Sequence, residues 1–117
     1  VRRQGQPKFR KALLAAYGKK CAVTGCDVES VLEAAHIAPY LGKESNAVQN
    51  GLLLRADIHT LFDLGELKIT EQGQVQLHET LYGTVYEQYQ GQQIQFPANQ
   101  AFAPSVEALA LKFERVL

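Results

Sequence analysis

Histidines supply the most obvious chemistry in this sequence, and two of the three stand at defined distances from an amide and a carboxylate. His36 precedes Asn50 by 14 residues, Asn50 precedes His59 by nine, and Asp63 follows His59 by four. A neutral imidazole can take a proton from water near pH 7, and imidazole together with carboxylate can hold a divalent cation. Hydrolysis of a phosphodiester has those two requirements, a base for water and a cation for the charge on the phosphate and the leaving oxygen.

The local pattern places these residues on two strands and a helix. We expect strands over residues 31–37 and 52–54, a polar joining loop over 40–50, and a helix over about 55–64. Pro39 bounds the first strand, the Asn-Gly pair at 50–51 is a turn signal, and Gly65 ends the helix. A separation of four puts His59 and Asp63 on one face of that helix, one turn apart. The resulting order is ββα, over about residues 31–65.

The rest of the chain predicts elements that surround this unit. They are a basic helix over 7–17 that begins at Pro7 and ends before Gly18, a short strand over 21–25 that closes in a turn, a hairpin of 67–70 with 75–78, and a C-terminal helix from 104 or 105 to about 116. Residues 81–95 are rich in Tyr and Gln and have weak periodicity. Tyr82, Tyr86 and Tyr89 could stack on bases, although packing against the C-terminal helix is the simpler interpretation. We therefore predict one α+β domain over residues 1–117.

Charge is balanced overall but unevenly distributed along the chain. Twelve Lys and Arg offset 12 Asp and Glu, yet the first acidic residue is Asp27. Seven basic residues precede it, namely Arg2, Arg3, Lys8, Arg10, Lys11, Lys19 and Lys20. Such a segment suits contacts to a phosphate backbone, and we select Arg2, Arg3, Arg10 and Lys11 as nucleic-acid contacts. A solvated helix face explains the same charges equally well.

Two cysteines, Cys21 and Cys26, are too few for a closed structural zinc site, which normally takes four Cys or His ligands. His36 could be a third ligand, but a fourth is hard to nominate. A disulfide between the two cysteines would need an oxidising compartment. We interpret both as reduced thiols, with zinc binding as the minor alternative.

The bulk composition is that of a globular domain rather than a disordered or membrane-spanning chain. Hydrophobic residues make up 46% and charged residues 21%. There is no apolar run of the roughly 20 residues that would span a bilayer, and no signal-peptide pattern. The sequence begins at Val1 and contains no Met. We expect a domain trimmed from a longer cytoplasmic protein, with further domains as partners and no membrane attachment.

Three stretches together resemble the HNH endonuclease family, in particular its restriction-type branch, which includes nucleases for modified DNA. They are residues 21–25 (CAVTG), 33–39 (EAAHIAP) and 50–63 (NGLLLRADIHTLFD). The resemblance covers about residues 5–65 well and the C-terminal half loosely. It implies a ββα-metal (HNH, or His-Me finger) core, a DNA substrate, and a divalent cation that could be Mg, Mn, Ni or Zn.

The resemblance also implies roles for individual residues. His36 would be the general base, and Asn50 would hold the long loop so that His36 is oriented. His59 would bind the cation, with Asp63 as a second ligand or a hydrogen-bond acceptor beside it. Arg55 would clamp a phosphate through a bidentate contact.

One departure from the family pattern leaves the ligand set and the activity open. Many members have an Asp or His ligand directly before the general base, where this chain has Ala35. Glu33 could reach in, but a residue three before His36 points to the opposite face of a regular strand. The alternative to a nuclease is therefore a non-catalytic nucleic-acid-binding module, and a third hypothesis is an interaction domain held by zinc at the two cysteines. If the domain does cut, one site cuts one strand, so a double-strand break would call for a homodimer.

Overall fold

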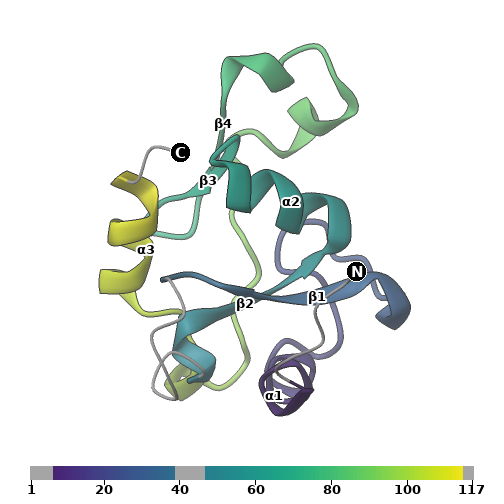
Figure 1. Ribbon diagram of the computed structural model, residues 1–117, viewed down its shortest axis with the longest axis vertical. Helices are drawn as coiled ribbons and strands as arrows, with labels where there is room; N and C mark the ends of the chain where they lie inside the picture. Colours follow the sequence, from purple (N-terminus) through teal and green to yellow (C-terminus); the bar gives the residue numbers. More distant parts are fainter. Residues whose placement is uncertain (1–6, 39–46, 115–117) are drawn as a thin grey trace.

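A two-stranded antiparallel sheet lies between two helices in the computed structural model, which describes residues 7–38 and 47–114 (Figure 1). Strand β1 (Leu32–His36) pairs with β2 (Gly51–Arg55). Helix α1 (Pro7–Ala16) packs on one face of this sheet, and α2 (Ala56–Leu64), which follows β2 directly, packs on the other. The predicted ββα order and α+β class are confirmed.

The register of the two strands decides which side chains meet which helix. His36 pairs with Gly51 on the α1 face, whereas Glu33 pairs with Leu54 and lies on the α2 face. Gly51 permits the close approach of α1, because a Cβ atom there would lie 2.6 Å from Cζ of Phe9. The sequence "NG" therefore matters here for packing as well as for the turn that it signals.

Helix α2 is held by apolar contacts below it and by a glycine at its end. Ile58 and Phe62 are fully buried, and burial of each such side chain contributes about 1.5–3 kcal/mol. Gly65 ends the helix in the left-handed region with φ 77°, where a side chain would be strained. Its N–H contacts the last carbonyls of the helix. This anchoring fixes the outward face that carries His59 and Asp63.

The C-terminal half forms a second small layer against α2. A hairpin of β3 (Leu67–Ile69) and β4 (Val75–Leu77) packs beside α2, and α3 (Val106–Glu114) packs on β3. Short 3-10 helices span Glu29–Val31, Val48–Asn50, Glu79–Leu81, Val85–Tyr89 and Gln100–Phe102. No helix within the described residues is long and apolar enough to cross a membrane.

The strand predicted over residues 21–25 is wrong, because this segment forms a turn. The N–H of Gly25 donates to the carbonyl of Cys21, which reverses the chain at once. The buried Sγ of Cys21 accepts the N–H groups of Thr24 and Arg55 at 3.4 and 3.2 Å. The bond from Ala22 N–H to Leu53 O also joins the segment to β2. Both cysteines are free thiols.

Candidate metal and catalytic site

His59 lies between two carboxylates, one from the strand and one from its own helix. Its Nδ1 is 2.7 Å from Oε1 of Glu33, and its Nε2 is 3.2 Å from Oδ2 of Asp63. The side chains of His59 and Glu33 are largely buried, at 23% and 18% exposure, whereas Asp63 is 58% exposed. The structure thus brings the two predicted helix residues together with Glu33.

The two carboxylates favour the charged form of His59. Burial acts in the opposite direction and lowers the pKa of the imidazole, but the hydrogen bonds and negative charges of Asp63 and Glu33 outweigh it. The pKa of His59 is consequently raised above its ordinary value. The surroundings of His59 therefore stabilise positive charge at this position.

The donor atoms around His59 have the chemistry that a divalent cation needs. Ligand atoms at about 2.0–2.2 Å from one cation lie about 3 Å from each other, and Nε2 of His59 lies 3.2 Å from Oδ2 of Asp63. Among the described residues, no group of three or more His, Cys, Asp and Glu is arranged to hold a metal ion. His59 and Asp63 therefore fit as a pair of ligands, and water and substrate oxygens would complete the coordination.

His36 lies on the other face of β1, in contact with α1. Its ring stacks on the ring of Phe9, with centroids 4.4 Å apart and planes inclined by 16°. His36 thus lies on the opposite face of β1 from Glu33, the strand residue that contacts His59.

Asn50 ties together the two ends of the loop that joins the strands. Its Oδ1 accepts the N–H of Ala38 at 2.8 Å, and its Nδ2 donates to the carbonyl of Ala38 at 3.4 Å. Its own carbonyl accepts the N–H of Ile37. These bonds fix the backbone directly after His36, and the role of Asn50 in orienting that base stays a prediction.

Arg55 already has a carboxylate partner in the chain. Its Nε and one terminal nitrogen donate to the two carboxylate oxygens of Asp57 at 2.7 and 3.0 Å, and the hydroxyl of Tyr86 donates to the same carboxylate at 2.8 Å. The hydrogen bond from Arg55 is the main cause that lowers the pKa of Asp57 to about 2. Tyr86 thus packs toward α2, and its predicted packing on the C-terminal helix is wrong.

The predicted nucleic-acid contacts differ in what the fold leaves available. The guanidinium of Arg10 donates to the backbone carbonyls of Leu32 and Glu29 at 3.2 and 2.9 Å, so it braces β1 instead of pointing freely to solvent. Lys11 is exposed. Arg2 and Arg3 lie outside the described residues.

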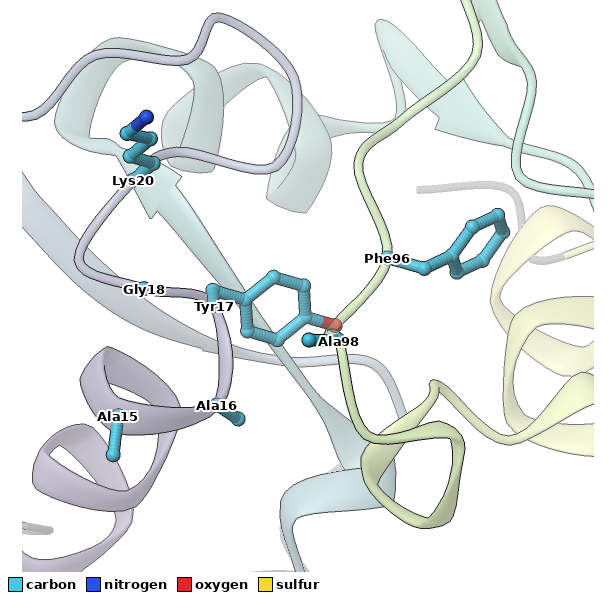
Figure 2. A pocket seen from close by; sticks show the side chains of 7 residues that line it. All are labelled: Ala15, Ala16, Tyr17, Gly18, Lys20, Phe96 and Ala98. Carbon is cyan, nitrogen blue, oxygen red and sulfur yellow. The ribbon is translucent and has the colours of Figure 1, made fainter.

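A surface hollow lies at the end of α1. In Figure 2 the hydroxyl end of Tyr17 is directed toward Ala98, while the Phe96 side chain points away from Tyr17. Its lining is mostly apolar, with Lys20 at the rim, and it includes none of the candidate site residues. We assign the hollow no role in the chemistry.

Comparison with known proteins agrees with the fold described above. Residues 21–70 match the family described as HNH endonuclease. A solved structure titled modification dependent TagI restriction endonuclease has a similar fold, with a TM-score of 0.64 and 23% identity. The match covers 87% of this chain and 35% of that one, so this chain spans about a third of its length. No curated protein sequence matches the chain.

Glu33 is the member of the cluster whose position sequence reasoning left unused. Glu33 points to the face of β1 opposite that of His36, as expected. Helix α2 covers this face and brings His59 into contact with Glu33. Two features of the sequence could have predicted the position of Glu33: the alternation of side chains along β1, and a helix that follows β2 directly. Asp57 was also overlooked, although an acid two residues after Arg55 in the first turn of a helix is a common partner.

Proposed function

We propose that this chain is the catalytic domain of a metal-dependent DNA endonuclease that hydrolyses phosphodiester bonds. The observation that carries the proposal is the pairing of His59 Nε2 with Asp63 at ligand spacing, inside the segment that matches the HNH family. The proposal is for this domain, and the domains that select the DNA are expected elsewhere in a longer protein.

The residues of the site divide the work of hydrolysis. His36 takes a proton from water at an imidazole nitrogen, and the water oxygen attacks phosphorus while the bond from phosphorus to the 3′ oxygen breaks. His59 and Asp63 hold a divalent cation, which supplies charge stabilisation for the phosphate and the leaving oxygen. Asn50 keeps the backbone after His36 in place through its bonds to Ala38.

Contacts to the DNA backbone come from the basic N-terminal segment and from Arg55. Lys11 is exposed on α1, and Arg2 and Arg3 precede that helix in the sequence. Two of the five guanidinium N–H groups of Arg55 point at Asp57, and Tyr89 is a further hydrogen-bond partner, so a phosphate would bind the N–H groups that remain. The pairing with Asp57 holds the guanidinium in one orientation, and this reduces the entropy lost when a phosphate binds.

A second candidate function is a nucleic-acid-binding module that does not cut. It is favoured by Ala35, which is fully buried where many relatives carry a ligand, and by the two-residue ligand pair. This alternative expects DNA binding that is independent of divalent cations. It also expects the melting temperature to be unchanged when such cations are added.

Nicking of supercoiled plasmid distinguishes the two. The protein is incubated with Mg²⁺, Mn²⁺, Ni²⁺ or Zn²⁺, or with EDTA, beside the variants His36→Ala, His59→Ala and His78→Ala. His78 is the matched control, because it is exposed and its imidazole accepts the N–H of Thr80, away from the cluster around His59. We expect cation-dependent nicking by wild type and by His78→Ala only.

The outcomes separate cleanly. Folded wild-type protein that binds DNA and cuts with none of the cations would contradict the nuclease proposal and favour the binding module. Cutting that survives in His36→Ala would remove His36 as the base while leaving the nuclease intact. Linear product formed at the same rate as nicked circles would indicate two sites acting together, as in a homodimer.

A further inference from the structure

We infer that Glu33 is a positioning residue of the cation site, which turns the His59 imidazole so that Nε2, beside Asp63, is the ligand nitrogen. The inference rests on the proposed function, because it assigns a role around the cation that His59 and Asp63 would hold. It adds a residue from β1 to a pair that belongs entirely to α2.

The contact itself selects the nitrogen. A carboxylate can only accept a hydrogen bond, and Oε1 of Glu33 lies 2.7 Å from Nδ1 of His59. Asp63 is likewise only an acceptor, so both ring nitrogens carry hydrogen when the imidazole is protonated. When His59 gives up one proton to bind a cation, the shorter contact to the less exposed carboxylate of Glu33 favours keeping the hydrogen on Nδ1, and Nε2 then provides the lone pair. Nε2 is also the nitrogen that lies 3.2 Å from Asp63.

The position of Glu33 makes it suited to orienting a neighbour. It stands inside β1 opposite Leu54, which is fully buried, and its own side chain is only 18% exposed. Asp63, by contrast, is 58% exposed near the end of α2. The strand thus provides a fixed acceptor, whereas the helix provides the more accessible carboxylate for a ligand.

Carboxylate–histidine–metal arrangements of this kind fix both the ring orientation and the basicity of the ligand nitrogen. Loss of such a partner typically lowers metal affinity by about 10- to 100-fold. Glu33→Ala removes the acceptor, and we expect a loss in that range. Glu33→Gln keeps a neutral carbonyl acceptor that can still receive the Nδ1 hydrogen, and we expect a smaller loss.

Two measurements on the full chain test this. Calorimetric titration with Mn²⁺ alone gives the affinity of wild type, Glu33→Ala, Glu33→Gln and the control Glu71→Gln, which alters an exposed glutamate in the β3–β4 turn. Nitrogen-15 NMR of the cation-free proteins, above the pKa of His59, shows which ring nitrogen carries hydrogen. Circular dichroism establishes that each variant is folded.

The expected result is an Nδ1–H tautomer in wild type, a shift toward Nε2–H in Glu33→Ala, and an affinity order of wild type, Gln, then Ala. An unchanged tautomer with an affinity within about twofold of wild type in Glu33→Ala would overturn the inference. An Nε2–H tautomer in wild type would overturn it as well. Failure of the proposed function looks different, because Mn²⁺ then binds with this same order and plasmid is still not nicked.

Discussion

The ring of Phe9 on α1 lies nearly parallel to the imidazole of His36, with ring centroids 4.4 Å apart. Phe9 is 3% exposed, and it also packs closely on Gly51, the residue paired with His36 across the sheet. Helix α1 therefore packs directly against His36, the proposed general base. Its position is set by core packing and not by the histidine alone.

Replacement of Phe9 by Leu should lower the stability of the fold and also disturb the alignment of His36, and the two effects can be measured separately. We expect a loss of about 1–3 kcal/mol in the free energy of unfolding, because the smaller side chain leaves a gap. We also expect nicking to slow by about tenfold or more, since small displacements of a catalytic group are costly. Urea denaturation and nicking rates give the two numbers. Leu109→Ala, a core change on α3, is the control and should lower stability without a comparable effect on rate.

Substitutions of Asn50 should show how much the anchoring of the loop after His36 contributes to stability and to nicking. Asn50→Ala leaves the backbone groups of Ala38 without their side-chain partner, which costs about 1–3 kcal/mol. Asn50→Asp retains the acceptor for the Ala38 N–H, and we expect an intermediate effect on both stability and nicking. Equal activity in wild type and Asn50→Ala would show that the loop needs no such anchor.

The pair of Arg55 and Asp57 should stabilise the fold near neutral pH and lose this contribution in acid. The pKa of Asp57 falls to about 2 in the folded state from an ordinary value of 3.8. Its contribution is therefore complete above about pH 4 and is lost as the pH falls through about 2. Thermal melts of Asp57→Asn should lie below wild type at pH 7 and approach it near pH 2. Parallel curves across that range would refute the coupling.

Protons should compete with the cation at His59. Because the folded-state pKa is raised, protonated His59 stabilises the cation-free fold below about pH 6.5, and this contribution is lost as pH rises through the folded-state pKa. The ligand nitrogen must lose its proton before it binds, so affinity for Mn²⁺ should rise about tenfold per pH unit below that pKa. Titrations in buffers of different ionisation enthalpy should report about one proton released. No release at any pH would place the cation elsewhere.

Arg10 and Lys11 are neighbours on α1 with opposite expected behaviour. Lys11→Ala should reduce the slope of DNA affinity against salt by about 1, with the melting temperature unchanged, because the side chain is exposed. Arg10→Ala should lower stability, because it removes the donor to the carbonyls of Glu29 and Leu32. Binding measured across a salt series, with melts beside it, checks both. A drop in melting temperature for Lys11→Ala alone would reverse the assignment.

Local patterns were sufficient for the elements that carry the site. Gly65 ended α2 as expected, and the spacing of His59 and Asp63 placed both on one helical face. The turn that closes residues 21–25 was expected, whereas the strand before it was wrong, and Cys21 instead accepts a hydrogen bond from the distant Arg55 N–H. Such a contact leaves no periodic trace in the segment itself.

The relations between elements were harder to predict than the elements. The alternation of side chains along β1 placed Glu33 and His36 on opposite faces of the strand. It did not predict that α2 would cover the face that carries Glu33. Likewise the basic character of Arg10 was visible, while the carbonyls that engage it lie 19 and 22 residues away in sequence. Tertiary contacts decide which of two possible roles such a side chain takes, and these contacts are not encoded in the local sequence.

The hydroxyl of Tyr86 donates to Asp57 at the start of α2, across a boundary that sequence comparison draws at residue 70. Gln92 and Gln95 cross the same boundary, donating to the carbonyls of Val23 and Ala22. The unit of homology is therefore smaller than the unit of folding. A chain cut after residue 70 would keep every proposed catalytic side chain and lose part of the scaffold that holds them, so grafting this domain onto another protein would require the residues between β3 and α3 as well.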